Sequence, residues 1–182
     1  MNTRKLTMNA ILLAIGAILH QITPILGLPM QPDFALVMLF IIMVLNKEDY
    51  KTSMVVALVT GIFTAMTTKF PGGQIPNIID KLITANCIYI LMLMIYRIKA
   101  FNKIDESKKN NIVALVILPI GTLISGTIFL LSAQVLVELP ASFLTLFLVV
   151  VLPSVVINLL AGMFLYKTVN LSLRRTAYST KM

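Results

Sequence analysis

The chain has 182 residues, of which 58% are hydrophobic and only 12% are charged, and its formal net charge at pH 7 is +8. Soluble domains contain about 45–50% apolar and about 25% charged residues, so this composition excludes an ordinary soluble domain and predicts an all-α integral membrane protein. The basic residues fall in short clusters between apolar runs, so no nucleic-acid partner is expected, and one cysteine and one histidine provide too few ligands for a metal site.

Six apolar segments predict a bundle of six transmembrane helices, because a helix needs about 20 apolar residues to cross a bilayer. Together the helices would form a single membrane domain, residues 1–182, with no cofactor. The expected helices cover, in chain order, about residues 6–22, 33–45, 52–68, 76–96, 112–137 and 142–169.

The first helix carries two alanines, Ala10 and Ala14, at a spacing that lets another helix approach closely in lipid. This pattern is explained either by packing inside the chain or by a docking face for a partner subunit. From the residues alone, both explanations stay open.

The second helix is unusually short. Its apolar run of about 13 residues would span roughly 20 Å, against about 30 Å for the hydrocarbon core. We therefore expect the proline-rich connector at residues 23–32 to enter the outer half of the membrane under cover of other helices. Asp33 follows the connector and is a suitable N-cap for the helix.

The most polar part of the chain outside its basic clusters is residues 67–81, which contain two prolines, two glycines and several charged and amide side chains. A loop is expected at residues 69–75, and Pro76 suits the first turn of the next helix. In that helix Asn77, Asp80, Lys81 and Thr84 share one face. Charges within a membrane helix are costly, so this face predicts a polar cavity.

The positions of the basic residues predict the orientation in the cell membrane. With six helices, every lysine and arginine except Lys69 and Lys81 would lie on the cytoplasmic side, together with both termini. The two exceptions belong to residues 67–81 and would lie near the outer side. Polar residues gathered at that side predict a ligand site, although they could instead be interfacial residues in contact with water.

Residues 67–81 resemble the signature of TrpP, the tryptophan-transporter subfamily among the bacterial S components of energy-coupling factor (ECF) transporters. The resemblance extends along the whole chain, including residues 14–17 with His20, and the pair Pro32 and Asp33. It implies an S-component-like bundle that binds L-tryptophan from outside and docks on a membrane T component coupled to two cytosolic ATPases. It also implies that Ala10 and Ala14 contact the T component.

A tryptophan site needs partners for a carboxylate, an ammonium group, an indole N–H and an aromatic ring. Lys81, Asn77 and Gln74 could bind the carboxylate, and Asp80 or Asp33 the ammonium group. Gln134, a threonine hydroxyl or a backbone carbonyl could accept from the indole. The expected substrate-binding residues are therefore Asp33, Thr68, Phe70, Gln74, Asn77, Asp80, Lys81 and Gln134.

Other interpretations remain at this stage. Asp80 and Lys81 could simply neutralise each other, and the ligand could be a vitamin or another small amphipathic molecule. An intramembrane enzyme is not expected, because the single histidine and the single cysteine lie on different predicted helices. The sequence also lacks the Gly-x-x-x-x-Gly-Lys-Ser/Thr motif of P-loop ATPases, so any ATP hydrolysis by that route would need a partner.

Overall fold

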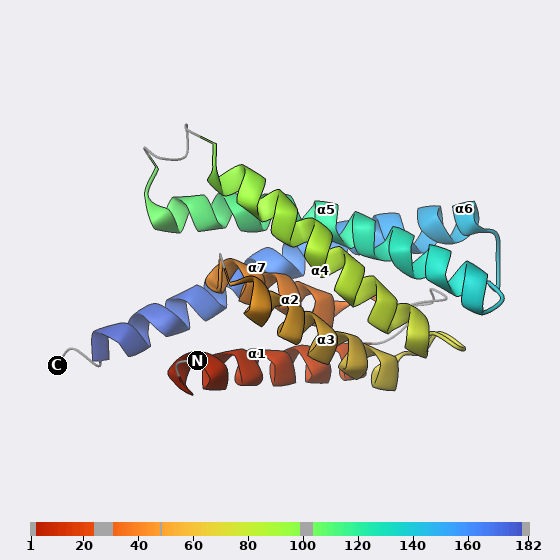
Figure 1. Ribbon diagram of the computed structural model, residues 1–182, viewed down its shortest axis with the longest axis horizontal. Coiled ribbons are helices and arrows are strands. Elements are labelled where there is room, and N and C mark those ends of the chain that lie inside the picture. Colours follow the sequence, from red (N-terminus) through yellow and green to blue (C-terminus); the bar gives the residue numbers. More distant parts are fainter. Residues whose placement is uncertain (1–2, 24–30, 48, 99–103, 180–182) are drawn as a thin grey trace.

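The computed structural model describes residues 3–23, 31–47, 49–98 and 104–179, and within these ranges the chain is helical and contains no strand. The helices run side by side in an elongated bundle, with both termini at the same end (Figure 1). Its elements are α1 (Thr3–Ile22), α2 (Phe34–Leu45), α3 (Tyr50–Thr67), α4 (Gln74–Tyr96), α5 (Glu106–Leu136), α6 (Phe143–Leu146), the π-helical segment η2 (Phe147–Val151) and α7 (Leu152–Ser179).

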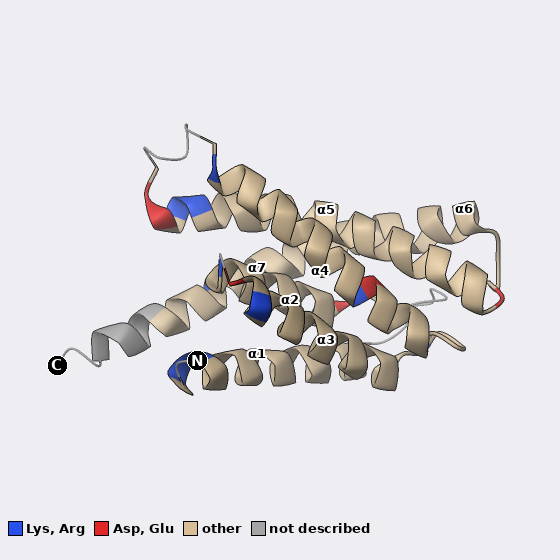
Figure 2. Ribbon diagram, viewed as in Figure 1, with Lys and Arg blue, Asp and Glu red and all other residues tan. Residues whose placement is uncertain are grey.

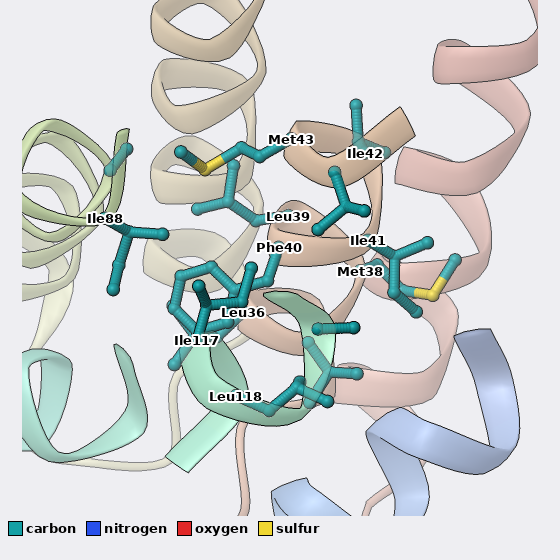
Figure 3. Packing of buried hydrophobic residues seen from close by; sticks show 14 of the residues in the cluster. Leu36, Met38, Leu39, Phe40, Ile41, Ile42, Met43, Ile88, Ile117 and Leu118 are labelled. Carbon is teal, nitrogen blue, oxygen red and sulfur yellow. The ribbon is translucent and has the colours of Figure 1, made fainter. Parts of the chain in front are cut away.

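Helix α2 forms the centre of the bundle. Every residue from 35 to 44 is buried, and α1, α3, α5 and α7 all pack against this helix. Figure 3 shows its side chains meeting Ile88 of α4 and Ile117 and Leu118 of α5. Asp33 caps the helix by accepting a hydrogen bond from the Leu36 backbone N–H at 2.9 Å. A helix that is enclosed by protein on all sides has apolar residues on every face, which explains the unbroken hydrophobic sequence of α2.

Five of the helical segments within the described residues are long and apolar enough to cross a membrane, while α2 is the short exception. The all-helical membrane class expected from composition is therefore confirmed. The orientation of the termini and the number of complete crossings stay predictions. The connector expected to enter the membrane lies mostly outside the described residues, since residues 24–30 are not among them.

Several helix boundaries differ from those expected from sequence. Helices α1 and α3 begin at Thr3 and Tyr50, three and two residues before their expected starts. Helix α4 begins at Gln74, so the last two residues of the expected loop belong to its first turn. Helix α5 begins at Glu106 rather than near residue 112, because Asp105 caps it by accepting from the Ser107 N–H at 3.2 Å. The last segment extends to Ser179 and contains η2, which ends two residues before Pro153. A proline lacks an N–H and crowds the preceding turn, which gives a physical reason for the wider π-helical turn there.

Charged residues gather at the end of the bundle that holds the termini (Figure 2). Lys5 of α1 contacts Asp49 at 2.7 Å, and Lys47 forms an ion pair with Glu106 at the start of α5. The hydrogen bond from Lys5 holds the pKa of Asp49 well below its usual range. These two pairs connect the turn between α2 and α3 to α1 and to α5.

Candidate functional site

A small cavity lies in the half of the bundle away from the termini. Its volume is about 70 Å³. The end of α1, the residues before α2, the connection between α3 and α4, and the facing parts of α4, α5, η2 and α7 all contribute to its wall. The lining residues are His20, Gln31, Asp33, Leu36, Thr68, Lys69, Phe70, Asn77, Asp80, Lys81, Thr122, Ser125, Gly126, Phe129, Val150, Val151, Ser154 and Asn158.

The centre of the cavity wall is a buried charged group from α4 and the start of α2. Lys81 and Asp80 are each 1% exposed. The Lys81 ammonium lies 2.7 Å from Asp33 Oδ2 and also donates to Asp80 Oδ2. Ser125 of α5 and Thr84 donate to the two carboxylate oxygens of Asp80, each at 2.8 Å. An ammonium group has three N–H donors, so two carboxylates leave one donor of Lys81 for another acceptor.

The burial of these charges suggests that they serve a ligand as well as each other. Two carboxylates and one ammonium group are enclosed in a membrane bundle, where ionisable residues are rare and costly. Hydrogen bonds from neighbouring hydroxyls offset part of that cost for Asp80. The group leaves more acceptor oxygens than donors, which suits a ligand that carries a positive charge.

His20 forms a second polar group beside the charged one. The Thr67 hydroxyl donates to the Phe63 carbonyl at 2.7 Å, so it accepts from His20 Nδ1, also at 2.7 Å. Gln31 Nε2 donates to the His20 backbone carbonyl at 2.9 Å. His20 Nε2 lies 3.9 Å from Asp33 Oδ1. The end of α1 is thereby connected to both α3 and the charged group.

Two aromatic rings close the cavity on the side of the α3–α4 connection. Phe70 and Phe129 meet edge to face, with their ring centroids 5.3 Å apart. The turn that follows Phe70 needs a glycine at Gly72, where φ is +71° and a Cβ atom would lie 2.6 Å from Val137 Cγ1. This turn holds Phe70 against α5.

The structure brings together six of the eight expected binding residues and leaves two outside. Asp33, Thr68, Phe70, Asn77, Asp80 and Lys81 all line the cavity. Gln74 and Gln134 are exposed and do not line it. Gln134 follows the buried Ala133, and one residue along a helix rotates a side chain by about 100°, which turns it away from the core.

Four polar lining residues on α5 and α7 were absent from the sequence-based site: Thr122, Ser125, Ser154 and Asn158. All four are buried. The sequence contained a signal for them. Thr122 and Ser125 are three residues apart and Ser154 and Asn158 are four apart, so each pair lies on one helix face. Polar residues inside membrane helices commonly mark functional sites. Which of these faces meet the charged face of α4 depends on how the helices pack.

Ala10 and Ala14 do not pack inside the bundle. Both are exposed and line an apolar groove of about 410 Å³ between α1 and α3. The close contact of α1 with α2 is instead made at Gly16, where an added Cβ would lie 2.9 Å from Met38 Cβ. The two alanines are therefore available at the surface of the isolated chain.

These features define a class: a helical, multi-pass membrane protein with a small polar cavity enclosed by its helices. The chain belongs to the TrpP family, described as tryptophan transporter TrpP, whose family model matches residues 2–174. A family of transporters agrees with the expectation that the chain is not an enzyme, and confirms the resemblance seen in residues 67–81.

Similar proteins come from several bacteria. A protein of Clostridium perfringens named "Probable tryptophan transport protein" is 54% identical over 176 residues, covering 97% of this chain and 96% of the relative. Proteins with the same name from Clostridium acetobutylicum and Bacillus subtilis are 43% and 41% identical, and each alignment covers at least 96% of both chains. No solved structure matches this chain.

Proposed function

We propose that this chain is the substrate-binding S component of an ECF-type importer and that it binds L-tryptophan from the extracellular side. The observation that carries the proposal is the charged group of Asp33 with the buried Asp80 and Lys81, in a cavity that also contains the Phe70–Phe129 pair. Membership of a tryptophan transporter family supports the choice of ligand.

The charged group suits the two charges of an amino acid. The ligand's ammonium group would bind Asp33 and Asp80, which offer carboxylate oxygens in a desolvated site. Its carboxylate would accept from the remaining donor of Lys81, and Lys69 lines the same cavity from the more exposed side. The aromatic pair closes one end of the cavity, and other apolar lining residues, such as Leu36 and Val151, offer a surface for the indole ring.

Binding would require the cavity to widen. A volume of about 70 Å³ is well below the roughly 300–1,000 Å³ of most ligand pockets. The connection between α3 and α4 is the part of the wall best suited to move, because it contributes Phe70 and is short and rich in glycine. Displacement of Phe70 from Phe129 would open the cavity on its own side. If the termini are cytoplasmic, that side faces outward.

The groove that contains Ala10 and Ala14 would receive the T component. It is almost wholly apolar and contains Ala10 and Ala14, whose small side chains allow a partner helix to come close. The T component would connect this chain to two cytosolic ATPases. The groove is formed by α1 and α3, whereas the cavity shares no lining residue with it and is reached by α1 only through His20, so docking and ligand binding can be tested separately.

Intrinsic fluorescence provides a direct test of the ligand. The chain has no tryptophan, so bound L-tryptophan is the only indole present. We expect saturable binding in detergent with a shifted emission, and Asp80→Asn should weaken it by about 10- to 150-fold, the effect of losing one charged hydrogen bond. Glu138→Gln is the matched control, since it removes an exposed carboxylate outside the cavity. Binding of a vitamin but not of tryptophan would refute the proposed ligand.

A further inference from the structure

Two buried polar atoms of the cavity wall have no hydrogen-bond partner among the described residues, Gln31 Oε1 and Asn158 Oδ1. Gln31 lies at the half-buried edge of the cavity beside His20, whereas Asn158 is fully buried. Asn158 of α7 is 1% exposed and lines the cavity. Its carbonyl oxygen, Oδ1, is buried and has no hydrogen-bond partner among the described residues. Buried polar groups in native proteins are almost always paired, so an unpaired acceptor that faces a cavity indicates a donor supplied by an occupant.

The orientation of the Asn158 amide follows from its neighbour Thr122 on α5. The Thr122 hydroxyl donates its proton to the Leu118 backbone carbonyl at 2.8 Å, so its oxygen can only accept a further hydrogen bond. Asn158 Nδ2 donates to that oxygen at 3.3 Å. Turning the amide over would place two acceptors against each other. Asn158 Oδ1 is therefore the atom that this side chain leaves for a ligand.

The lining residues of α5 give the position of this acceptor relative to the other groups. Phe129 meets Phe70, Ser125 donates to Asp80, and Thr122 accepts from Asn158. Thr122 and Ser125 are three residues apart, or about 4.5 Å along the helix. The amide thus lies about one turn from the charged group, on the side away from the aromatic pair. This separation is comparable to that between the α-carbon of tryptophan and its ring nitrogen.

We propose that Asn158 determines ligand specificity by accepting a hydrogen bond from the indole N–H of tryptophan, an assignment that rests on the proposed function. Tryptophan has two kinds of N–H donor, and the ammonium group is satisfied by Asp33 and Asp80. The indole N–H is the remaining donor. A ligand without it leaves Asn158 Oδ1 unpaired, and sites that hydrogen-bond a ligand strongly reject analogues that lack the bonding group.

The first test uses the wild-type protein and needs no substitution. Isothermal titration calorimetry in detergent would compare L-tryptophan with 3-benzothienyl-L-alanine, in which sulfur replaces the ring N–H. We expect the analogue to bind at least about tenfold more weakly. Equal affinities would overturn the role of Asn158 while leaving tryptophan binding intact. If neither compound binds, both the role and the proposed function are wrong.

The second test assigns the discrimination to this side chain. Asn158→Leu keeps a similar volume and removes the acceptor, so the ratio of the two affinities should fall to within about twofold, mainly through weaker tryptophan binding. Asn170→Leu is the matched control, because it makes the same change in α7 outside the cavity and should keep the wild-type ratio. An unchanged ratio in Asn158→Leu would refute the assignment. If Asn158→Leu does not fold, the wild-type comparison decides.

Discussion

Replacing Lys81 with methionine is expected to destabilise the fold as well as to abolish binding. Lys81 is 1% exposed, and both Asp33 and Asp80 are paired with its ammonium group. Methionine fills a similar volume but leaves the two carboxylates facing each other. The expected loss therefore comes from uncompensated buried charge and not from a cavity.

The size of this loss can be worked out from the geometry. Two oxygens that are both hydrogen-bonded to one nitrogen are no more than roughly 6 Å apart. Two unit charges at that distance repel by about 3 kcal/mol at an effective dielectric constant near 20. Breaking a buried ion pair by removing one partner typically costs about 3–5 kcal/mol. Because total stabilities are about 5–15 kcal/mol, this loss would be a large fraction of the total.

Thermal unfolding followed by circular dichroism in detergent measures this effect. A loss of this size should lower the Tm of Lys81→Met by roughly 10 °C. The control Lys108→Met changes an exposed lysine on α5 and should have the same Tm as the wild type. The double variant Asp80→Asn/Lys81→Met removes the repulsion and should recover much of the lost stability. A Lys81→Met protein as stable as the wild type, or a double variant less stable than Lys81→Met, would refute this account.

Two further changes test other parts of the molecule. Ala10→Leu or Ala14→Leu should leave tryptophan affinity unchanged but block uptake in the assembled transporter, and uptake that survives both changes would remove the docking assignment. Gly121→Ala places a Cβ against the ring of Phe40, so it should destabilise the bundle by about 1–3 kcal/mol in the same unfolding assay. Wild-type stability for Gly121→Ala would show that α2 and α5 are not packed closely there.

Local sequence properties carried a large part of the prediction. The membrane class follows from composition, and most helices follow from the length of their apolar runs. The shared face of Asn77, Asp80 and Lys81 follows from helical periodicity, because residues three and four apart lie on one side of any helix. Asp33 was recognisable as an N-cap from its position before an apolar run. Each of these properties depends on neighbours within a few residues.

The wrong predictions concern side-chain directions and helix ends, which a residue's position in the sequence does not determine. Gln134 was expected in the site because it lies near the C-terminal end of α5, which was predicted to face outward. Its side chain is exposed and does not line the cavity. The start of α5 was placed at a change in hydropathy, whereas the helix extends into polar residues that can be helical at a membrane surface. The start of α4 was placed at Pro76, two residues after its observed start at Gln74. Hydropathy reports the position of the bilayer better than the end of a helix.

The sequence by itself determined the chain's class, its approximate helices and the one helix face with two buried charges, because all three depend on composition and local periodicity. Only the tertiary structure decided that α2 is the enclosed centre, that Asp33 shares Lys81 with Asp80, and that Asn158 enters the same cavity from α7. These relations join residues up to 125 positions apart, from Asp33 to Asn158. They depend on the rotation and packing of whole helices, which no local pattern specifies.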